Sequence, residues 1–371
     1  MDLDFTEEQQ LLQDMAKALL EEHSPIEIVR EYEDDPKGYP DELWKQVSEA
    51  GLAGVLIAEE HGGAGMNLLD AVLLYEEFGR AMAPVPHFVS AVMSAGILSE
   101  AGSEDQKSEW LPKIASGDSI LTPAWLERDR GFGERGVAMP ATADGDGFVL
   151  NGEKRHVNYA LAAERLIVLA RTDAGVDLFL VDPKAEGIEL NQVLSQSGEP
   201  HFDVTFSNVR VEGSQRIGAA GSGWSTYSKV MERGIILQAS WAIGGADRCL
   251  AETVEYANTR VQFDKPLGAF QALAHYMADD STRIEGGRVL VYEAAWNDAQ
   301  GRSIARFAPM AKLFCGNAYR DCTASCAQIW GGVAFTIEYD TQLFFRRAKQ
   351  FQLSWWDTPY LEELVAADVL G

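Results

Sequence analysis

The sequence predicts a mixed α and β protein in which a central β region separates two helical regions. Apolar residues recur at helical spacing from Thr6 to about Gly117 and again from Trp224 onward. Between these stretches the pattern changes to short β-rich runs that are bounded by turn sequences. We therefore expect an N-terminal helical domain over residues 1–118, an antiparallel β domain over 119–221 and a C-terminal helical domain over 222–371.

In the N-terminal region, Thr6 is placed to cap a first helix, with Glu8 and Gln9 behind it. The apolar residues that follow at helical spacing are Leu11, Leu12, Met15, Leu19 and Leu20. The sequence HGGAG at 61–65 interrupts the helical pattern, which resumes over residues 68–82.

Five short apolar runs in the central region predict strands, and they cover residues 148–150, 166–170, 178–181, 204–206 and 209–211. Three dipeptides typical of turns separate them: Asp144-Gly145, Asn151-Gly152 and Asp182-Pro183. We expect one compact antiparallel β unit of about 100 residues.

After Trp224, helical patterns run over about 224–260, 270–300 and 303–330, with a final segment after Phe335. The four cysteines of the chain, Cys249, Cys315, Cys322 and Cys326, all lie in this region. No further Cys or His stands close enough to complete a metal site, so we expect buried free thiols and no bound metal.

The net charge of −26 excludes a general binder of nucleic acid, because such proteins neutralise phosphates with Lys and Arg. Residues 1–224 carry 40 acidic and 17 basic groups, whereas residues 225–371 carry 17 and 14. No apolar run approaches the roughly 18 residues of a membrane-spanning helix, and no signal sequence opens the chain. We expect a cytoplasmic protein that does not enter the membrane.

Glu232 is the first candidate for chemistry. It stands three and four residues before Ile235 and Ile236 and shares their apolar helical stripe, which Ala239 and Ile243 continue. A carboxylate on a buried helix face has a raised pKa, which suits a general base that works near neutral pH. The alternative is a solvent-exposed Glu near the start of a helix, where the helix dipole favours it.

Two further segments are candidates for ligand binding. Arg260 ends a predicted helix before a turn that contains Pro266 and Gly268, where a guanidinium suits a phosphate; the alternative is a surface Arg near a helix C-terminus. Gly331 and Gly332 interrupt a helical pattern and would let a ligand approach the backbone, although a turn that ends the helix explains them equally well.

Taken together, these segments resemble the acyl-CoA dehydrogenase family. The family pattern TRxQFxxPLxxFQ stands here as TRVQFDKPLGAFQ at 259–271, and its QxHGGxGF-type pattern stands as QIWGGVAF at 328–335. The stretches GLAGVLIAEEHGGAG at 51–65 and EEFGRAMAPVP at 76–86 are similar to N-terminal signatures of the family. The resemblance covers nearly the whole chain, in the family's order.

The resemblance implies an N-terminal helical domain, a β domain and a C-terminal four-helix bundle. It also implies FAD, an acyl-CoA substrate and electron-transfer flavoprotein as acceptor. In such enzymes a carboxylate removes the α-proton while the β-hydrogen passes as hydride to flavin N5. The resemblance assigns cofactor binding to Arg260, Phe263, Gln271, Gln328, Gly331 and Gly332. In the family, the Arg of the TRxQF pattern and the QxxGG segment, here Arg260 and residues 328–332, serve the flavin of a neighbouring subunit.

The resemblance also bears on the catalytic base. Many members carry it in a C-terminal Tyr-Glu-Gly-Thr motif, but this chain reads LSWWDTP at 353–359 instead. A minority carry it in a Glu-Arg pair on the first C-terminal helix, which Glu232-Arg233 matches. We therefore expect Glu232 to be the base and Arg233 to be its electrostatic neighbour at the substrate.

Several family positions are altered. In the flavin loop of the β domain only Glu127 matches, and the segment that stacks on the flavin is His156-Val157-Asn158, in which Asn158 is the candidate ligand. Trp330 and Ala334 replace the His and the last Gly of the HGGxG pattern. This erosion resembles bacterial members that work as pairs of unlike subunits.

Three hypotheses follow from these observations. The chain is an active acyl-CoA dehydrogenase that uses Glu232, a half-site or non-catalytic subunit of a heteromeric dehydrogenase, or a protein that catalyses another acyl-CoA reaction on the same scaffold. Each hypothesis predicts a homo- or hetero-oligomer with a dehydrogenase-like chain. The acyl group does not follow from the sequence.

Overall fold

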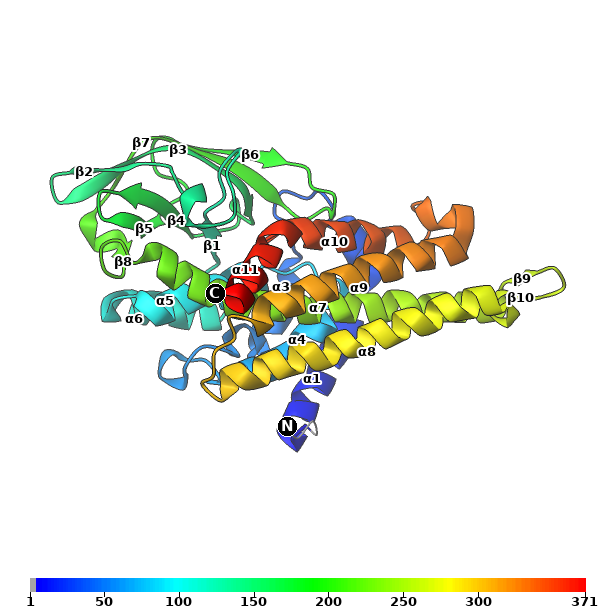
Figure 1. The fold of residues 1–371 in the computed structure, drawn as a ribbon. Helices are drawn as coiled ribbons and strands as arrows, with labels where there is room; N and C mark the ends of the chain where they lie inside the picture. The colour runs from blue at the N-terminus through cyan, green and yellow to red at the C-terminus, as the bar shows by residue number, and fades with distance from the viewer. Residues whose placement is uncertain (1–4) are drawn as a thin grey trace. The chain divides into compact units, whose positions relative to one another are not determined.

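The computed structural model describes residues 5–371, which form two compact units (Figure 1). The β-containing unit comprises Arg30–Asn67 and Pro84–Gly234. The helical unit comprises the chain up to Val29, Leu68–Ala83 and Ile235–Gly371. The predicted N-terminal helical segment is thus shared between the two units, and the three domain boundaries given above remain a prediction.

The β-containing unit has short helices before its strands. Its helical elements are α2 (Ile26–Glu31, shared with the other unit), α3 (Asp41–Glu49), η1 (Leu52–Gly54), η2 (Glu59–His61), η3 (Phe88–Ser94), α5 (Ala95–Ala101), α6 (Glu104–Ala115), η4 (Glu134–Gly136), η5 (Gly213–Gln215) and the first turns of α7 (Gly223–Thr259). Ser103 and Gln106 form a capping box that begins α6. The segment η3 is a π-helix, a conformation that is rare in proteins.

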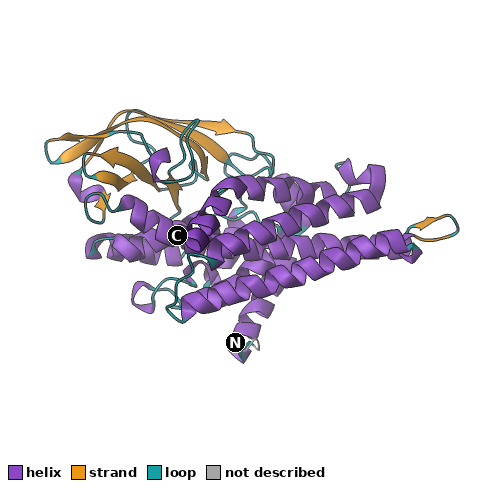
Figure 2. Ribbon diagram, in the orientation of Figure 1, coloured by secondary structure: helices purple, strands orange, loops and turns teal. Residues whose placement is uncertain are grey.

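Two four-stranded sheets face each other in this unit (Figure 2). Their strands are β1 (Leu121–Ala124), β2 (Ala141–Asp144), β3 (Gly147–Asn158), β4 (Arg165–Thr172), β5 (Gly175–Val181), β6 (Ile188–Val193), β7 (His201–Val211) and β8 (Arg216–Ile217). One sheet has the order β1-β4-β5-β8 and the other β2-β3-β7-β6. Buried side chains of both sheets form one apolar core, which includes Leu150, Val168, Phe179 and Val204.

The β region differs from the prediction in three respects. Strands β1 and β4 pair in parallel, and the long loop and two other strands between them in the chain provide the connection that a parallel pair requires. Asn151-Gly152 is not a turn but lies within β3, where the register against β7 shifts between Leu150 and Gly152, so these residues form a β-bulge. The runs at 204–206 and 209–211 belong to the single strand β7.

The helical unit contains α1 (Glu7–His23), α4 (Leu68–Ala81), most of α7, the hairpin β9 (Val261–Gln262) and β10 (Lys265–Pro266), η6 (Leu267–Ala269), α8 (Gln271–Ala299), α9 (Phe307–Trp330), η7 (Gly331–Phe335), α10 (Thr341–Leu353) and α11 (Thr358–Leu370). Thr6 caps α1, as predicted, and it also forms a capping box with Gln9. The long helices confirm the patterns expected after Trp224. All four cysteines are buried and free, as predicted.

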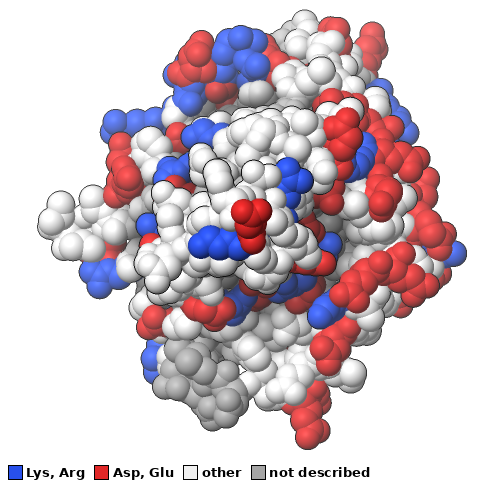
Figure 3. Space-filling model, turned by 90° about the vertical axis from the view of Figure 1, so that its right-hand side faces the viewer, with Lys and Arg blue, Asp and Glu red and all other residues white. Residues whose placement is uncertain are grey.

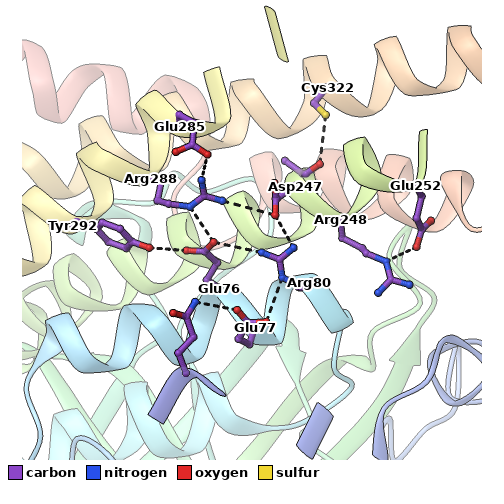
Figure 4. A network of polar contacts seen from close by, with 12 residues as sticks. Glu76, Glu77, Arg80, Asp247, Arg248, Glu252, Glu285, Arg288, Tyr292 and Cys322 are labelled. Atoms are coloured by element: carbon purple, nitrogen blue, oxygen red, sulfur yellow. Dashed lines mark hydrogen bonds and ion pairs between the residues drawn. The ribbon is translucent and has the colours of Figure 1, made fainter. Parts of the chain in front are cut away.

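A network of ion pairs joins α4, α7 and α8 inside the helical unit (Figure 4). The Arg80 guanidinium lies 2.6 Å from an oxygen of Asp247 and 3.2 Å from Glu77, and Arg288 lies 3.0 Å from Glu76. Glu76 and Glu77 are only 3% and 4% exposed, so these partners balance charges that would otherwise be costly to bury. The sequence EEFGRA at 76–81 therefore has a structural role in this chain.

A buried lysine holds the turn that joins α10 to α11. The Nζ atom of Lys312 donates to the backbone oxygens of Phe351, Ser354 and Trp356 at 3.2, 2.7 and 2.8 Å.

No helix within residues 5–371 combines the length and the apolar character that crossing a membrane requires.

Candidate functional site

Glu232 lies in the third turn of α7, on the apolar face that the sequence predicted. Ile235, Ile236 and Ala239 are fully buried on this face, and Glu232 itself is half-buried. Burial raises the pKa of the Glu232 carboxyl above its ordinary value because the charged form loses hydration. A carboxylate with a raised pKa is a stronger base than an exposed one, which is what abstraction of a carbon-bound proton requires.

The turn that carries Glu232 packs against the π-helix η3. A Cβ atom added to Gly234 would stand 3.0 Å from the Met93 Sδ and 3.2 Å from a ring carbon of Phe88. Gly234 therefore permits close contact between α7 and η3. The residue pattern at 88–94 did not predict this π-helix, and short π-helical turns are frequent at functional sites.

A cavity of about 160 Å³ lies between η3, α5 and the first turns of α7. Its α7 wall consists of Lys229, Val230 and Arg233, which stand on both sides of Glu232 in the chain. The other walls are made by Leu56, Ala91, Val92, Ala95, Gly96, Ser99 and Glu100. Arg233, the predicted substrate contact, is exposed and lines this cavity, whereas Glu232 is not among the lining residues and lies on the opposite side of α7 from Val230.

The predicted flavin-binding residues of the C-terminal region gather at one end of the helical unit. Arg260 follows the last residue of α7, and the hairpin β9–β10 carries Phe263 at its tip. Gln271 begins α8, and Gln328, Gly331 and Gly332 stand at the end of α9. Their proximity follows from contacts between α7 and α9, because Trp330 stacks on Tyr256 with the ring centroids 4.0 Å apart. Figure 1 shows the hairpin at this end of the α8 helix.

The backbone at Gly331 and Gly332 is accessible. Gly331 has φ 70° and ψ −145°, a conformation that is strained for any residue with a side chain. A Cβ atom added at Gly332 would meet nothing within 4 Å, so this chain's own packing does not require glycine there. A glycine that the fold does not need fits the close approach of another molecule to the backbone.

This end of the helical unit is also apolar and exposed. Phe263, Phe335 and Ile337 are 85%, 65% and 77% exposed, values that are unusual for such large apolar side chains. Arg260 is exposed as well. In the face drawn in Figure 3, acidic side chains crowd one margin and much of the centre is uncharged. The total charge therefore does not describe the local surface.

One helix separates the two groups of predicted residues. Glu232 and Arg260 are 28 positions apart, and α7 is continuous from Gly223 to Thr259. At about 1.5 Å per residue, the helix places them about 40 Å apart along its axis. Arg260 and Glu232 of one chain therefore cannot both contact the same part of one bound ligand.

Glu127, the predicted flavin residue of the β domain, has partners within the chain. Its carboxylate accepts hydrogen bonds from the backbone nitrogens of Ala138 and Met139 and from the Lys154 Nζ atom, the last at 2.6 Å. Lys154 is fully buried, and burial lowers its pKa to about 8 despite the opposing effect of Glu127. Glu127 thus anchors the loop between β1 and β2, and its predicted contact with the cofactor remains a prediction.

Asn158 stands at the end of β3, where it pairs with His201 of β7. Its side-chain nitrogen lies 3.1 Å from the His201 Nε2 atom, and its backbone oxygen accepts a hydrogen bond from Thr122. Partial loss of hydration, together with the nearby His201 and Arg155, lowers the pKa of the neighbouring His156. The segment 156–158 is therefore ordered by intrachain contacts at the edge of the sheet.

Models of the acyl-CoA dehydrogenase family match almost the entire chain. The "Acyl-CoA dehydrogenase, N-terminal domain" model matches residues 6–118, the middle-domain model residues 124–209 and the C-terminal-domain model residues 221–354. The chain belongs to the acyl-CoA dehydrogenase family. Members of this family are FAD-dependent oxidoreductases that act on acyl-CoA, so this chain is an oxidoreductase of that class.

Three similar proteins illustrate the relationship. The caffeyl-CoA reductase–Etf complex subunit CarC of Acetobacterium woodii is 28% identical, with 99% of each chain covered. The structure of butyryl-CoA dehydrogenase from Megasphaera elsdenii superposes with a TM-score of 0.92 at 26% identity, over 100% of both chains. A chain of the ChsE4–ChsE5 complex from Mycobacterium tuberculosis gives 0.91 at 26% identity, over 100% of this chain and 99% of that chain.

The residues at the end of the helical unit fit the FAD that this family uses. Arg260 offers an exposed guanidinium with the geometry that suits a pyrophosphate, and Gln271 and Gln328 offer exposed amides. The accessible backbone at Gly332 permits close approach of the phosphates. The β-domain residues fit less directly, because Glu127 and Asn158 already have hydrogen-bond partners within the chain.

Proposed function

We propose that this chain desaturates an acyl-CoA at the α and β carbons, with Glu232 as the catalytic base. The single observation that carries this proposal is a half-buried carboxylate with a raised pKa on the apolar face of α7 that Ile235, Ile236 and Ala239 form. The match of the whole chain to a family of acyl-CoA oxidoreductases supports it.

In this mechanism FAD, when bound, accepts the β-hydrogen as hydride. The chain's own contribution is to hold the acyl group with its α-carbon at Glu232 and to take up the α-proton on a carboxylate oxygen. The apolar face of α7 excludes water from the carboxylate and so keeps it basic. Arg233, the next residue of α7, is exposed and supplies positive charge near the thioester end of the substrate.

We propose further that the flavin site is completed by a second subunit. Support comes from the roughly 40 Å of helix between Glu232 and Arg260, since one chain cannot bring both to one flavin. The exposed Phe263, Phe335 and Ile337 offer apolar surface for that contact. The second subunit is a further copy of this chain or a dehydrogenase-like partner, and the similarity to a chain of the ChsE4–ChsE5 complex supports assembly with another chain.

The second candidate function is that of a half-site subunit, which contributes Arg260 and Gly332 to a partner's flavin and carries out no chemistry itself. The intrachain partners of Glu127 and Asn158 favour it, because they occupy groups that the β-domain half of a flavin site would use. We propose electron-transfer flavoprotein as the acceptor in either case, which the name of the Acetobacterium woodii relative supports.

Anaerobic reduction of the purified protein tests the proposal. The protein is isolated with any chain that co-purifies, its flavin is counted per protomer, and acyl-CoA thioesters are added without oxygen. We expect about one flavin per Glu232-containing site and bleaching of the flavin absorbance by an acyl-CoA. A chain that holds no flavin alone and gains activity only with an unlike partner would favour the half-site function instead.

A further inference from the structure

We propose that a cavity of about 300 Å³ inside the helical unit binds a small organic cation, a primary ammonium group on a short alkyl chain. The cavity lies between the end of α1, the start of α2, the end of α4, the second half of α7 and the first turn of α10, and all its lining residues belong to this unit. Exposed Lys17, Glu21 and Glu27 lie at its edge. Neither Glu232 nor any predicted flavin-binding residue lines it, so the inference goes beyond the proposed reaction.

A buried hydroxyl group is the first observation that points to a ligand. Ser24 follows the last residue of α1, lines the cavity and is only 4% exposed. Its backbone nitrogen donates to the Leu20 oxygen at 2.9 Å, but its side-chain oxygen has no hydrogen-bond partner within residues 5–371. A buried polar group that lacks a partner costs free energy, and a donor on a bound molecule would remove that cost.

The charges around the cavity are the second observation. In the network of Figure 4, three guanidinium groups face five carboxylates, those of Glu76, Glu77, Asp247, Glu252 and Glu285. Glu77 and Glu252 line the cavity together with Arg80 and Arg248. Arg80 is shared between Glu77 and Asp247, and the Arg248 side chain is 48% exposed. The interior therefore carries an excess of negative charge that a bound cation would balance.

The protonation behaviour of the two lining carboxylates agrees with this excess. Burial raises the pKa of Glu77 and of Glu252, because the charged forms lose hydration. Repulsion from Glu76 adds to the rise at Glu77. Arg80 and Arg248 oppose the rise at Glu77 and Glu252 respectively without offsetting it. A further positive charge in the cavity would favour the ionised form of both carboxylates.

The walls and the size of the cavity favour an organic cation over a metal ion. Part of its wall is apolar and almost completely buried, and consists of Leu20, Met82 and Phe344. Among the described residues, no group of three or more His, Cys, Asp or Glu side chains is arranged to hold a metal. The volume is about twice the 150 Å³ or so that holds benzene. An alkyl chain would contact the apolar wall, while the three N–H donors of its ammonium group would reach Ser24, Glu77 and Glu252.

Calorimetry and thermal unfolding of the purified protein test the proposal. Pentylamine and cadaverine are the probes, in about 0.15 M KCl so that general attraction to the acidic surface is screened. Pentan-1-ol and pentanoate have the same chain without the positive charge, and MgCl₂ supplies the charge without the chain. We expect saturable binding of an amine and a melting temperature that rises with its concentration, and neither effect with the three controls. Absence of saturable amine binding, or an equal rise with MgCl₂, would overturn the inference.

A matched pair of variants assigns the binding to this cavity. Glu252→Gln removes a carboxylate from the cavity, whereas Glu255→Gln removes one from an exposed position of α7 outside it. We expect the Kd of the amine to rise by about tenfold or more in Glu252→Gln and to stay within about twofold in Glu255→Gln. Equal Kd values in the two variants would overturn the inference.

Ser24→Ala separates a binding role of the hydroxyl from a structural one. The hydroxyl is unpartnered in the free protein, so we expect the variant to melt no lower than the unmodified protein when no ligand is present. With the amine present, the variant should bind more weakly and be stabilised less. An unchanged Kd for the amine in Ser24→Ala would overturn the inference.

Discussion

Trp330 lies flat against Tyr256, with ring centroids 4.0 Å apart and ring planes within 10° of parallel. Its indole nitrogen donates to the Thr253 hydroxyl at 3.0 Å. These contacts fix the end of α9 to the end of α7, immediately before the accessible backbone of Gly331 and Gly332. The residue that departs from the family's HGGxG pattern thus holds the glycine segment in place in this chain.

Substitutions at Trp330 should therefore change flavin retention. Trp330→Phe keeps the aromatic stack and loses one hydrogen bond, worth about 1 kcal/mol, and we expect near-normal flavin content. Trp330→Ala loses the stack and leaves a space, at a cost of about 3–5 kcal/mol, and should lose flavin on gel filtration. Flavin per protomer and urea unfolding measure both effects. Equal flavin retention in the two variants would show that the stack does not position the glycines.

The buried Glu127–Lys154 pair should be essential for folding of the β domain. Glu127→Gln leaves the Lys154 ammonium buried without its carboxylate, and we expect a loss of about 3–5 kcal/mol in the free energy of unfolding. Lys45→Met, which removes the partly exposed pair with Glu49, serves as the control and should cost less than about 1 kcal/mol. If both variants unfold at the same urea concentration, the buried pair contributes no more to stability than the surface pair, which would contradict this prediction.

His87 makes stability depend on pH. The ring is fully buried with its Nε2 atom 3.0 Å from the Leu52 oxygen, and burial lowers its pKa from 6.5 to about 4. Between these pH values the unfolded chain binds the proton and the folded chain does not, so stability falls as the pH drops from 6.5 to 4. The loss approaches about 3 kcal/mol.

Urea unfolding at several pH values checks this dependence. His87→Gln should remove that part of the slope between pH 6.5 and 4, whereas His275→Gln, at an exposed position, should not. A His87→Gln protein with the same pH profile as the unmodified protein would contradict the assignment.

Arg260 and Glu232 should act in trans if the second subunit is another copy of this chain. Arg260→Gln is expected to lower flavin content by about tenfold or more with little change in melting temperature, since the side chain is exposed. Co-expression of Arg260→Gln and Glu232→Gln chains should then restore activity, because one site of each hybrid combines an intact Glu232 with an intact Arg260. Failure to complement, with hybrids confirmed by mass, would rule out a site shared between copies.

The sequence predicted the order of the elements because the spacing of apolar residues and the helix-capping residues can be read directly from it. The Thr6 cap, the long helices after Trp224 and the burial of Ile235 and Ile236 were all predicted in this way. It failed where local sequence competes with tertiary structure. Asn151-Gly152 favours a turn, but pairing with β7 turns it into a bulge.

Part of the candidate site could likewise not be predicted from the sequence. Sequence spacing identified Glu232 and Arg260, yet the π-helix at 88–94 has no distinct residue signature. The partners of Glu127, the backbone of Ala138 and Met139 and the buried Lys154, depend on how the β1–β2 loop folds back onto β3. Such contacts between distant segments are set by packing and cannot be read from periodicity.

Glu232→Gln tests the central claim most directly. The amide keeps the size of the side chain but cannot accept the α-proton as a base, so the rate of flavin bleaching by the best acyl-CoA should fall by about 10²–10⁴-fold. Flavin content and acyl-CoA binding should remain unchanged, and in the unmodified protein the bleaching rate should fall on acidification at a pH above the ordinary Glu pKa. Stopped-flow absorbance under anaerobic conditions measures the rate. A Glu232→Gln protein that bleaches at a rate near that of the unmodified protein would contradict the assignment of Glu232 as the base.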